Sequence, residues 1–147
     1  MPGPRTTSFL AGERPDDVAI YLPEETLSGG EELLETDYAE PADGGVILVV
    51  AGERGQATFE EVTGTDPMTF AGSAMGTPGS IDADLAGGEC PNAIEGPQDH
   101  QLRFVFAFAE DQNEEVGGIY AEGDVIHAYA QCSCGETYAD KWVAGER

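Results

Sequence analysis

Positive charge is scarce in this sequence. Six basic residues stand against 29 acidic ones among 147 residues, and the formal net charge is −23. Lysine occurs once, as Lys141, and the other basic residues are arginines at positions 5, 14, 54, 103 and 147. A surface so poor in cations neutralises few phosphates, so the composition argues against direct binding of nucleic acid.

The acidic residues are distributed along the chain and do not form a tail; pairs recur at 16–17, 60–61 and 114–115, for example. A compact fold with this excess of charge repels itself at low ionic strength. Molar salt relieves the repulsion, because it shortens the Debye length to about 3 Å. We therefore expect a salt-adapted protein. The alternative is an acidic mimic of nucleic acid, although mimics usually concentrate their charge.

Long hydrophobic runs are also absent. The longest aliphatic run, residues 46–51, is far shorter than the roughly 20 residues of a membrane-spanning helix. The first residues lack the pattern of a secretory signal. Three cysteines are an odd number, which disfavours a secreted disulfide framework. We expect a cytosolic protein with no membrane partner.

Common enzyme signatures are missing as well. The chain has no phosphate-binding loop ending in Gly-Lys-Ser or Gly-Lys-Thr, and Ser73 does not lie in a nucleophile elbow. A thiol- or metal-dependent enzyme that uses Cys132, Cys134 and a histidine stays open as an alternative. However, Cys132 and Cys134 lack the two-residue spacing that is usual for redox pairs.

The hydrophobic content, 40%, is sufficient for a core. In the first half we predict strands at residues 18–22 and 46–50, a helical turn near 8–13 and helices near 30–34, 56–62 and 66–75. The last helix begins with Thr65 or Asp66 as its cap and Pro67 in its first turn. Its predicted apolar face, which we expect in the core, comprises Met68, Phe70, Ala71, Ala74 and Met75.

The second half predicts an antiparallel β-meander. Strands are expected at residues 102–109, 119–122, 125–131 and 137–143, because apolar residues alternate there between turn signals. We thus predict an α+β fold in one domain, residues 1–147. In it, N-terminal strands and short helices (1–88) pack with a C-terminal antiparallel meander (89–147).

Two cysteine turns bound this meander, at Cys90-Pro91 and at Cys132-Ser133-Cys134-Gly135. Residues 127–142, HAYAQCSCGETYADKW, resemble the second half of a zinc ribbon of the transcription and translation kind, and Cys90-Pro91 resembles its first knuckle. The resemblance implies a zinc-ribbon-like meander. The sequence departs from the ribbon pattern in two places: Ala93 stands where a cysteine is usual, and the second turn has the shorter Cys-x-Cys spacing.

Three thiolates remain where a closed structural zinc site needs four ligands. If zinc binds, we expect Cys90, Cys132, Cys134 and His100 as its ligands, with Asp99 as the next candidate for the fourth position. The alternative is a metal-free ribbon in which the cysteines are small buried side chains.

The whole chain also resembles a family of small acidic proteins from halophilic archaea, through the phrases GERPDDVAIYL and GIYAEGDVIHAYAQC. That resemblance implies habitat and fold and brings no activity. We therefore expect a non-catalytic adaptor that binds a protein partner, within transcription or translation as ribbons often do. A direct RNA binder is a further alternative, and it would gather Arg54, Arg103 and Lys141 on one face. His127 is expected to be partly buried and paired to backbone.

Overall fold

The computed structural model describes residues 4–13, 16–23, 39–42, 45–81, 85, 88–89, 102–110, 112, 115–132 and 135–144. These residues form an α+β fold, a six-stranded antiparallel sheet with short helices, which confirms the predicted class. No helix among them combines the length and the apolar character that crossing a membrane requires.

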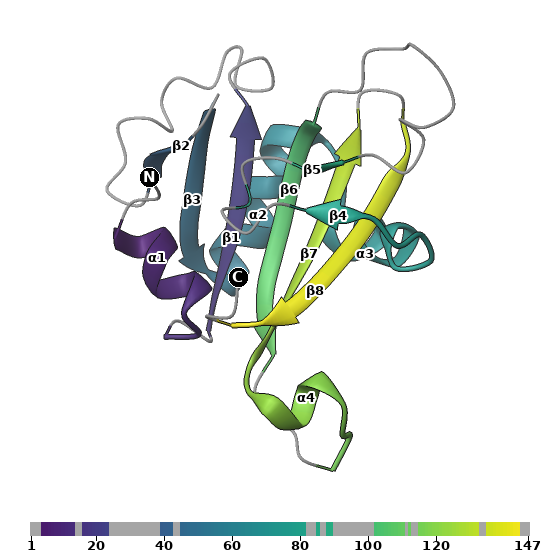
Figure 1. Cartoon of the computed structure of the whole chain (residues 1–147). Coiled ribbons are helices and arrows are strands. Elements are labelled where there is room, and N and C mark those ends of the chain that lie inside the picture. The colour runs from purple at the N-terminus through teal and green to yellow at the C-terminus, as the bar shows by residue number, and fades with distance from the viewer. Residues whose placement is uncertain are drawn as a thin grey trace.

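The sheet joins the two halves of the chain edge to edge (Figure 1). Its spatial order is β2-β3-β1-β6-β7-β8. The strands are β1 (Asp17–Pro23), β2 (Ala39–Ala42), β3 (Gly45–Ala51), β6 (Leu102–Glu110), β7 (Val125–Cys132) and β8 (Thr137–Val143). Because β1 pairs with β3 on one side and with β6 on the other, the halves share one sheet and are not two packed layers.

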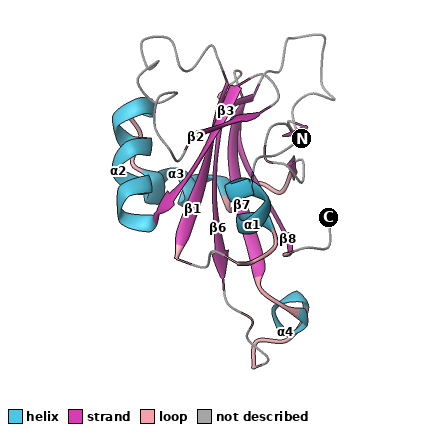
Figure 2. Cartoon of the chain, turned by 90° about the vertical axis from the view of Figure 1, so that its left-hand side faces the viewer, coloured by secondary structure: helices cyan, strands magenta, loops and turns pink. Residues whose placement is uncertain are grey.

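Helices α2 (Gly52–Thr63) and α3 (Pro67–Ala74) cover one face of this sheet, and α1 (Pro4–Leu10) lies on the other (Figure 2). Phe59 of α2 stacks on Phe70 of α3, with ring centroids 5.6 Å apart, and both rings meet Phe104 of β6 edge-on. Asp66 caps α3 as predicted, because its carboxylate accepts a hydrogen bond from Thr69 N at 2.9 Å. We call this surface of the sheet the helix face.

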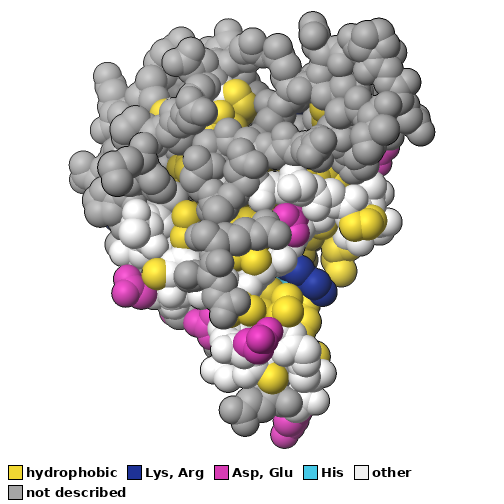
Figure 3. Space-filling model, viewed as in Figure 1, with side chains coloured by type: hydrophobic (Ala, Val, Ile, Leu, Met, Phe, Trp, Pro, Cys, Tyr) yellow, Lys and Arg dark blue, Asp and Glu magenta, His cyan; other side chains and the backbone are white. Residues whose placement is uncertain are grey.

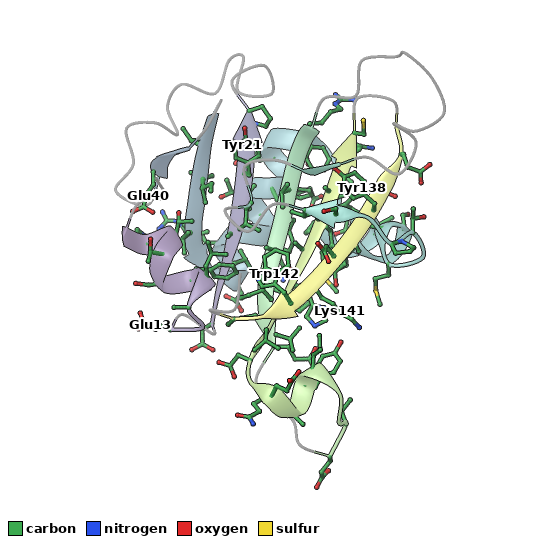
Figure 4. The ribbon with its side chains drawn as sticks, in the orientation of Figure 1. Glu13, Tyr21, Glu40, Tyr138, Lys141 and Trp142 are labelled. Atoms are coloured by element: carbon green, nitrogen blue, oxygen red, sulfur yellow. The ribbon has the colours of Figure 1, made fainter. Side chains whose placement is uncertain are left out.

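On the opposite face, Phe9 of α1 belongs to a second core that also includes side chains of the meander and Ile81 of β4. Helix α1 packs against β1 and β3, whereas the short hairpin of β4 (Ser80–Ile81) and β5 (Gly88–Glu89) packs against β7 and β8 through β4. Tyr138 and Trp142, both on β8, belong to this second core (Figure 4). Since both faces are covered, the central residues of β1 and β3 are buried on both sides. That explains why these strands read as continuous apolar runs.

The free edge of β8 is covered at its centre. Gly79 N donates to Ala139 O at 3.0 Å, and Ala139 N donates to Thr77 O at 2.9 Å. Gly79 is required there, because a Cβ atom would lie 2.8 Å from Tyr138 Cγ. Residues 77–79 therefore occupy backbone groups of β8 that could otherwise pair with a strand of another chain.

A buried carboxylate joins α1 to the edge strand β2. Glu40 is 7% exposed; its Oε1 accepts from Thr6 N at 2.8 Å and from Thr6 Oγ1 at 2.9 Å, and its Oε2 accepts from Arg5 N at 3.0 Å. The Arg5 guanidinium donates in turn to Val49 O. Figure 4 shows Glu40 beside the first turn of α1.

Three expectations from the sequence were wrong in detail. Residues 119–122 form the short helix α4 (Ile119–Glu122) and not a strand, because Gly117 and Gly118 adopt positive φ and start a helical turn. Helix α1 begins at Pro4, whereas a helical turn was expected only near residues 8–13. Strand β2 lies where no strand was predicted. The predicted helix near 30–34 falls outside the described residues.

Candidate functional site

A groove of about 1030 Å³ lies on the helix face, beside α3 and over strands β1, β6, β7 and β8. We call it the α3 groove. Helix α3 contributes Met68, Ala71, Gly72 and Met75 to its wall. Its floor is mainly aromatic and consists of Phe106, Phe108, His127 and Tyr129. The groove is therefore an apolar surface with a few polar groups, which is the usual composition of a binding site.

The strand register explains why these side chains meet. Val18, Phe108, His127 and Lys141 are cross-strand partners on β1, β6, β7 and β8, so they form one row across the helix face. The adjacent row holds Phe106, Tyr129 and Ala139. Alternating side chains on each strand thus produce an aromatic strip, because residues two apart point to the same face.

Two methionines of α3 are exposed beside this strip. Met68 is 65% exposed and Met75 68% exposed. The sequence placed both in the core face of the helix, and that was wrong: Phe70, Ala71 and Ala74 are the buried residues. Met68 and Met75 are seven residues apart, so they project from the same side of α3, towards the groove. Methionine is common at binding surfaces that adapt to their ligands.

A polar cluster closes one end of the groove. His127 Nε2 lies 2.9 Å from Glu110 Oε1. The His127 ring stacks between Phe108 and Tyr120, with centroid distances of 5.0 and 5.9 Å. His127 is partly buried as predicted, with its side chain 14% exposed. The partner that the structure gives it is a carboxylate, where the sequence predicted backbone.

Lys141 completes this end. Its Nζ donates to the Tyr120 hydroxyl at 3.3 Å and lies 5.2 Å from the Tyr120 ring centroid. In Figure 3, basic atoms lie among hydrophobic ones at the place where Figure 4 labels Lys141. The other charged residues in the described wall are acidic and comprise Asp16, Asp17, Glu110 and Asp140. Negative charge therefore predominates around the groove.

Tyr129 brings a buried hydroxyl to the floor of the groove. The residue is 4% exposed, and within the described part of the chain its hydroxyl has no hydrogen-bond partner. Burial raises the pKa of Tyr129 above its usual value of 10.0, and Tyr120 and the Glu110 carboxylate raise it further. The hydroxyl is thus protonated at neutral pH and is a hydrogen-bond donor.

The predicted zinc ligands are placed only in part. Cys132 ends β7 and lies in the core on the face opposite α2 and α3, 1% exposed. The predicted turn follows it: Gly135 N donates to Cys132 O at 2.9 Å, and Gly135 has a φ of 96°. Burial suits both a zinc ligand and a small core side chain. Cys90, His100 and Cys134 lie outside the described residues, so the four-ligand zinc site stays a prediction.

The sequence reasoning missed the groove itself. The aromatic residues of the second half of the chain do not share one face of the sheet. Tyr138 and Trp142 face one core, whereas Tyr129 faces the other and Tyr120 comes from α4. The alternation of Phe104, Phe106 and Phe108 already indicated an aromatic face. Its partial exposure could not be read from that pattern, because it depends on how far α3 extends over the sheet.

A family model described as a family of unknown function (DUF5807) matches residues 39–145. Because the match covers well over half of the chain, this protein belongs to that family. The matched residues include α3 and the strands β6, β7 and β8, and therefore most of the groove; α1 and β1 precede them. No curated protein and no solved structure matches the chain.

Proposed function

We propose that this protein is a non-catalytic adaptor that binds a segment of a protein partner in the α3 groove. The observation that carries the proposal is the exposure of Met68 and Met75 over an aromatic floor. Exposed apolar surface next to a groove is typical of a protein-interaction site. With Val116, these methionines are the large hydrophobic side chains that the described residues leave exposed.

An enzyme is supported less well. The pair of His127 and Glu110 resembles an oriented general base. However, the described residues that line the groove include no serine, threonine or cysteine beside it. Cys132 lies in the core on the opposite face of the sheet. The thiol-dependent alternative therefore has no support from the groove.

Direct RNA binding is also supported less well. That alternative requires Arg54, Arg103 and Lys141 together, whereas Lys141 lines the groove and the two arginines do not. Acidic residues around the groove would repel phosphates. We propose instead a protein partner in a salt-rich cytosol, with transcription or translation as the setting that the ribbon resemblance favours.

Replacing Met75 with glutamate is expected to reduce partner binding about tenfold or more, because it places a charge in the apolar contact. The test immobilises the chain, exposes it to an extract of its source cells in molar potassium chloride and quantifies the retained proteins. Val116→Glu is the matched control, since Val116 is 61% exposed and does not line the groove. The control is expected to retain the same proteins as the unmodified chain.

Equal retention by Met75→Glu and the unmodified chain would refute the groove as the binding surface. Equal losses in Met75→Glu and Val116→Glu would do the same, because they would indicate a general effect of added charge. Thermal melts of all three proteins show whether each is folded under the binding conditions. Met68→Glu repeats the test from the other end of α3.

A further inference from the structure

The α3 groove has a shape and chemistry that suit a peptide segment better than a compact small molecule. Its volume, about 1030 Å³, is at the upper limit of ordinary small-molecule pockets. One wall consists of flexible methionines, which fit themselves to different side chains. The floor offers a donor from Tyr129 among apolar rings. A peptide supplies both apolar side chains and regularly spaced carbonyl acceptors.

The Tyr129 hydroxyl is the first of two polar features that select an occupant. Tyr129 is a buried residue that lines the groove, and its hydroxyl has no hydrogen-bond partner within the described residues. A buried donor without an acceptor is costly, and an occupant that supplies a carbonyl oxygen removes that cost. The Tyr129 ring stacks against the Phe108 ring, with centroids 5.8 Å apart, and both residues line the groove together with Met68 and Met75. An acceptor for Tyr129 would therefore lie beside apolar side chains.

The second feature is the sign of the charge at one end of the groove. Val18 and Phe108 are antiparallel partners on β1 and β6. Asp16 and Glu110 lie two residues beyond them, so they are neighbours on the helix face. Both residues line the groove and both are exposed. One Glu110 oxygen contacts His127, and within the described part of the chain the other has no hydrogen-bond partner. A cationic side chain at this position gains two carboxylates.

We infer that the occupant is a peptide segment that carries a basic residue next to large apolar ones. Its basic side chain lies at Asp16 and Glu110, its apolar side chains contact Met68 and Met75, and a backbone carbonyl accepts a hydrogen bond from Tyr129. This inference rests on the proposed function and adds the chemistry of the partner.

The probes are synthetic peptides of about twelve residues. They share the same leucine and phenylalanine core and differ in their flanks, which are arginine, glutamine or glutamate. Dissociation constants are measured by fluorescence anisotropy across a potassium chloride series. The arginine-flanked peptide is expected to bind about tenfold more tightly than the glutamate-flanked one at the lowest salt at which the protein is folded.

Two variants test the polar contacts. Tyr129→Phe is expected to raise the dissociation constant of the arginine-flanked peptide about fivefold. The melting temperature should not fall, because the hydroxyl that is removed has no hydrogen-bond partner within the described residues. The double variant Asp16→Asn/Glu110→Gln is expected to remove most of the preference for arginine. Glu60→Gln/Glu61→Gln, an equal change in charge on exposed positions of α2 outside the groove, is expected to keep it.

The outcomes separate this inference from the proposed function. If Met75→Glu abolishes binding of all peptides and the flanks make no difference, the groove binds protein but charge does not select the occupant, and the inference is overturned. The inference is also overturned if no peptide binds while cellular partners are still retained through Met75. If Met75→Glu changes neither peptide binding nor partner retention, the proposed function itself is wrong.

Discussion

Replacing Glu40 with glutamine is expected to lower the free energy of unfolding by about 3 kcal/mol, since hydrogen bonds to a buried charge are worth roughly 1.5–3 kcal/mol each. The carboxylate accepts from Thr6 N, Thr6 Oγ1 and Arg5 N. A glutamine amide turns one of its acceptors into a donor, so it leaves buried N–H groups of α1 unpaired. For a chain of this length the loss corresponds to a fall of about 10 °C in melting temperature.

The effect of Glu40 should depend on pH in a defined direction. Burial alone raises the pKa of Glu40, but the hydrogen bonds from Arg5 and Thr6 and the charge of Arg5 outweigh it, so the pKa lies below its ordinary value of 4.5. The stabilisation is thus fully present above pH 4.5 and is lost as the pH falls through the lowered pKa. The difference between unmodified chain and Glu40→Gln should shrink below pH 4.5.

Glu13→Gln is the matched control for Glu40→Gln. It removes the same charge from an exposed position just beyond the other end of α1 (Figure 4), and its expected effect is below about 0.5 kcal/mol. Chemical denaturation at pH 7 and at pH 4 measures both variants. Equal stability of Glu40→Gln and Glu13→Gln at pH 7 would show that the buried carboxylate does not hold α1 to β2.

Molar potassium chloride is expected to raise the melting temperature by about 10 °C or more relative to low salt. The cause is the net charge of −23, because repulsion between acidic side chains opposes the compact state until salt screens it. On the face shown in Figure 3, the acidic side chains lie at separate places. Screening should therefore act over this face as a whole and not at one patch.

Thermal melts across a potassium chloride series measure this effect. Glu60→Gln/Glu61→Gln is the informative variant, since it removes two exposed charges from one surface of α2. Its melting temperature is expected to depend less steeply on salt than that of the unmodified chain. A melting temperature that stays constant or falls as salt rises would contradict the salt adaptation that the composition predicts.

Local sequence signals were sufficient for most of the fold. Strands β1 and β3 were predicted from apolar runs between turn residues, and β6, β7 and β8 from alternation, because burial of one or both faces dictates those patterns. The cap of α3 at Asp66 was predicted from a capping residue followed by proline. What could not be predicted is the pairing of β1 with β6, because it joins residues that are far apart in the sequence.

The candidate site was less accessible to sequence reasoning. The cysteine turn that begins at Cys132 resembles a known sequence motif, whereas the groove consists of apolar and aromatic residues whose pattern is that of core residues. Met68 and Met75 belong to the same apolar arc as Phe70 and Ala74, but they lie at its edge, where the structure leaves them exposed. The contact of His127 with Glu110 likewise depends on the register of β6 and β7.

The most direct measurement of groove binding uses the methionine methyl groups. The chain has three methionines, Met1, Met68 and Met75, so selective methyl labelling gives two reporters in the groove and one at the N-terminus. Addition of the arginine-flanked peptide or of a retained partner protein is expected to shift the signals of Met68 and Met75 and to leave that of Met1 unchanged. Binding that leaves both groove signals in place would contradict the proposal that this protein holds its partner in the α3 groove.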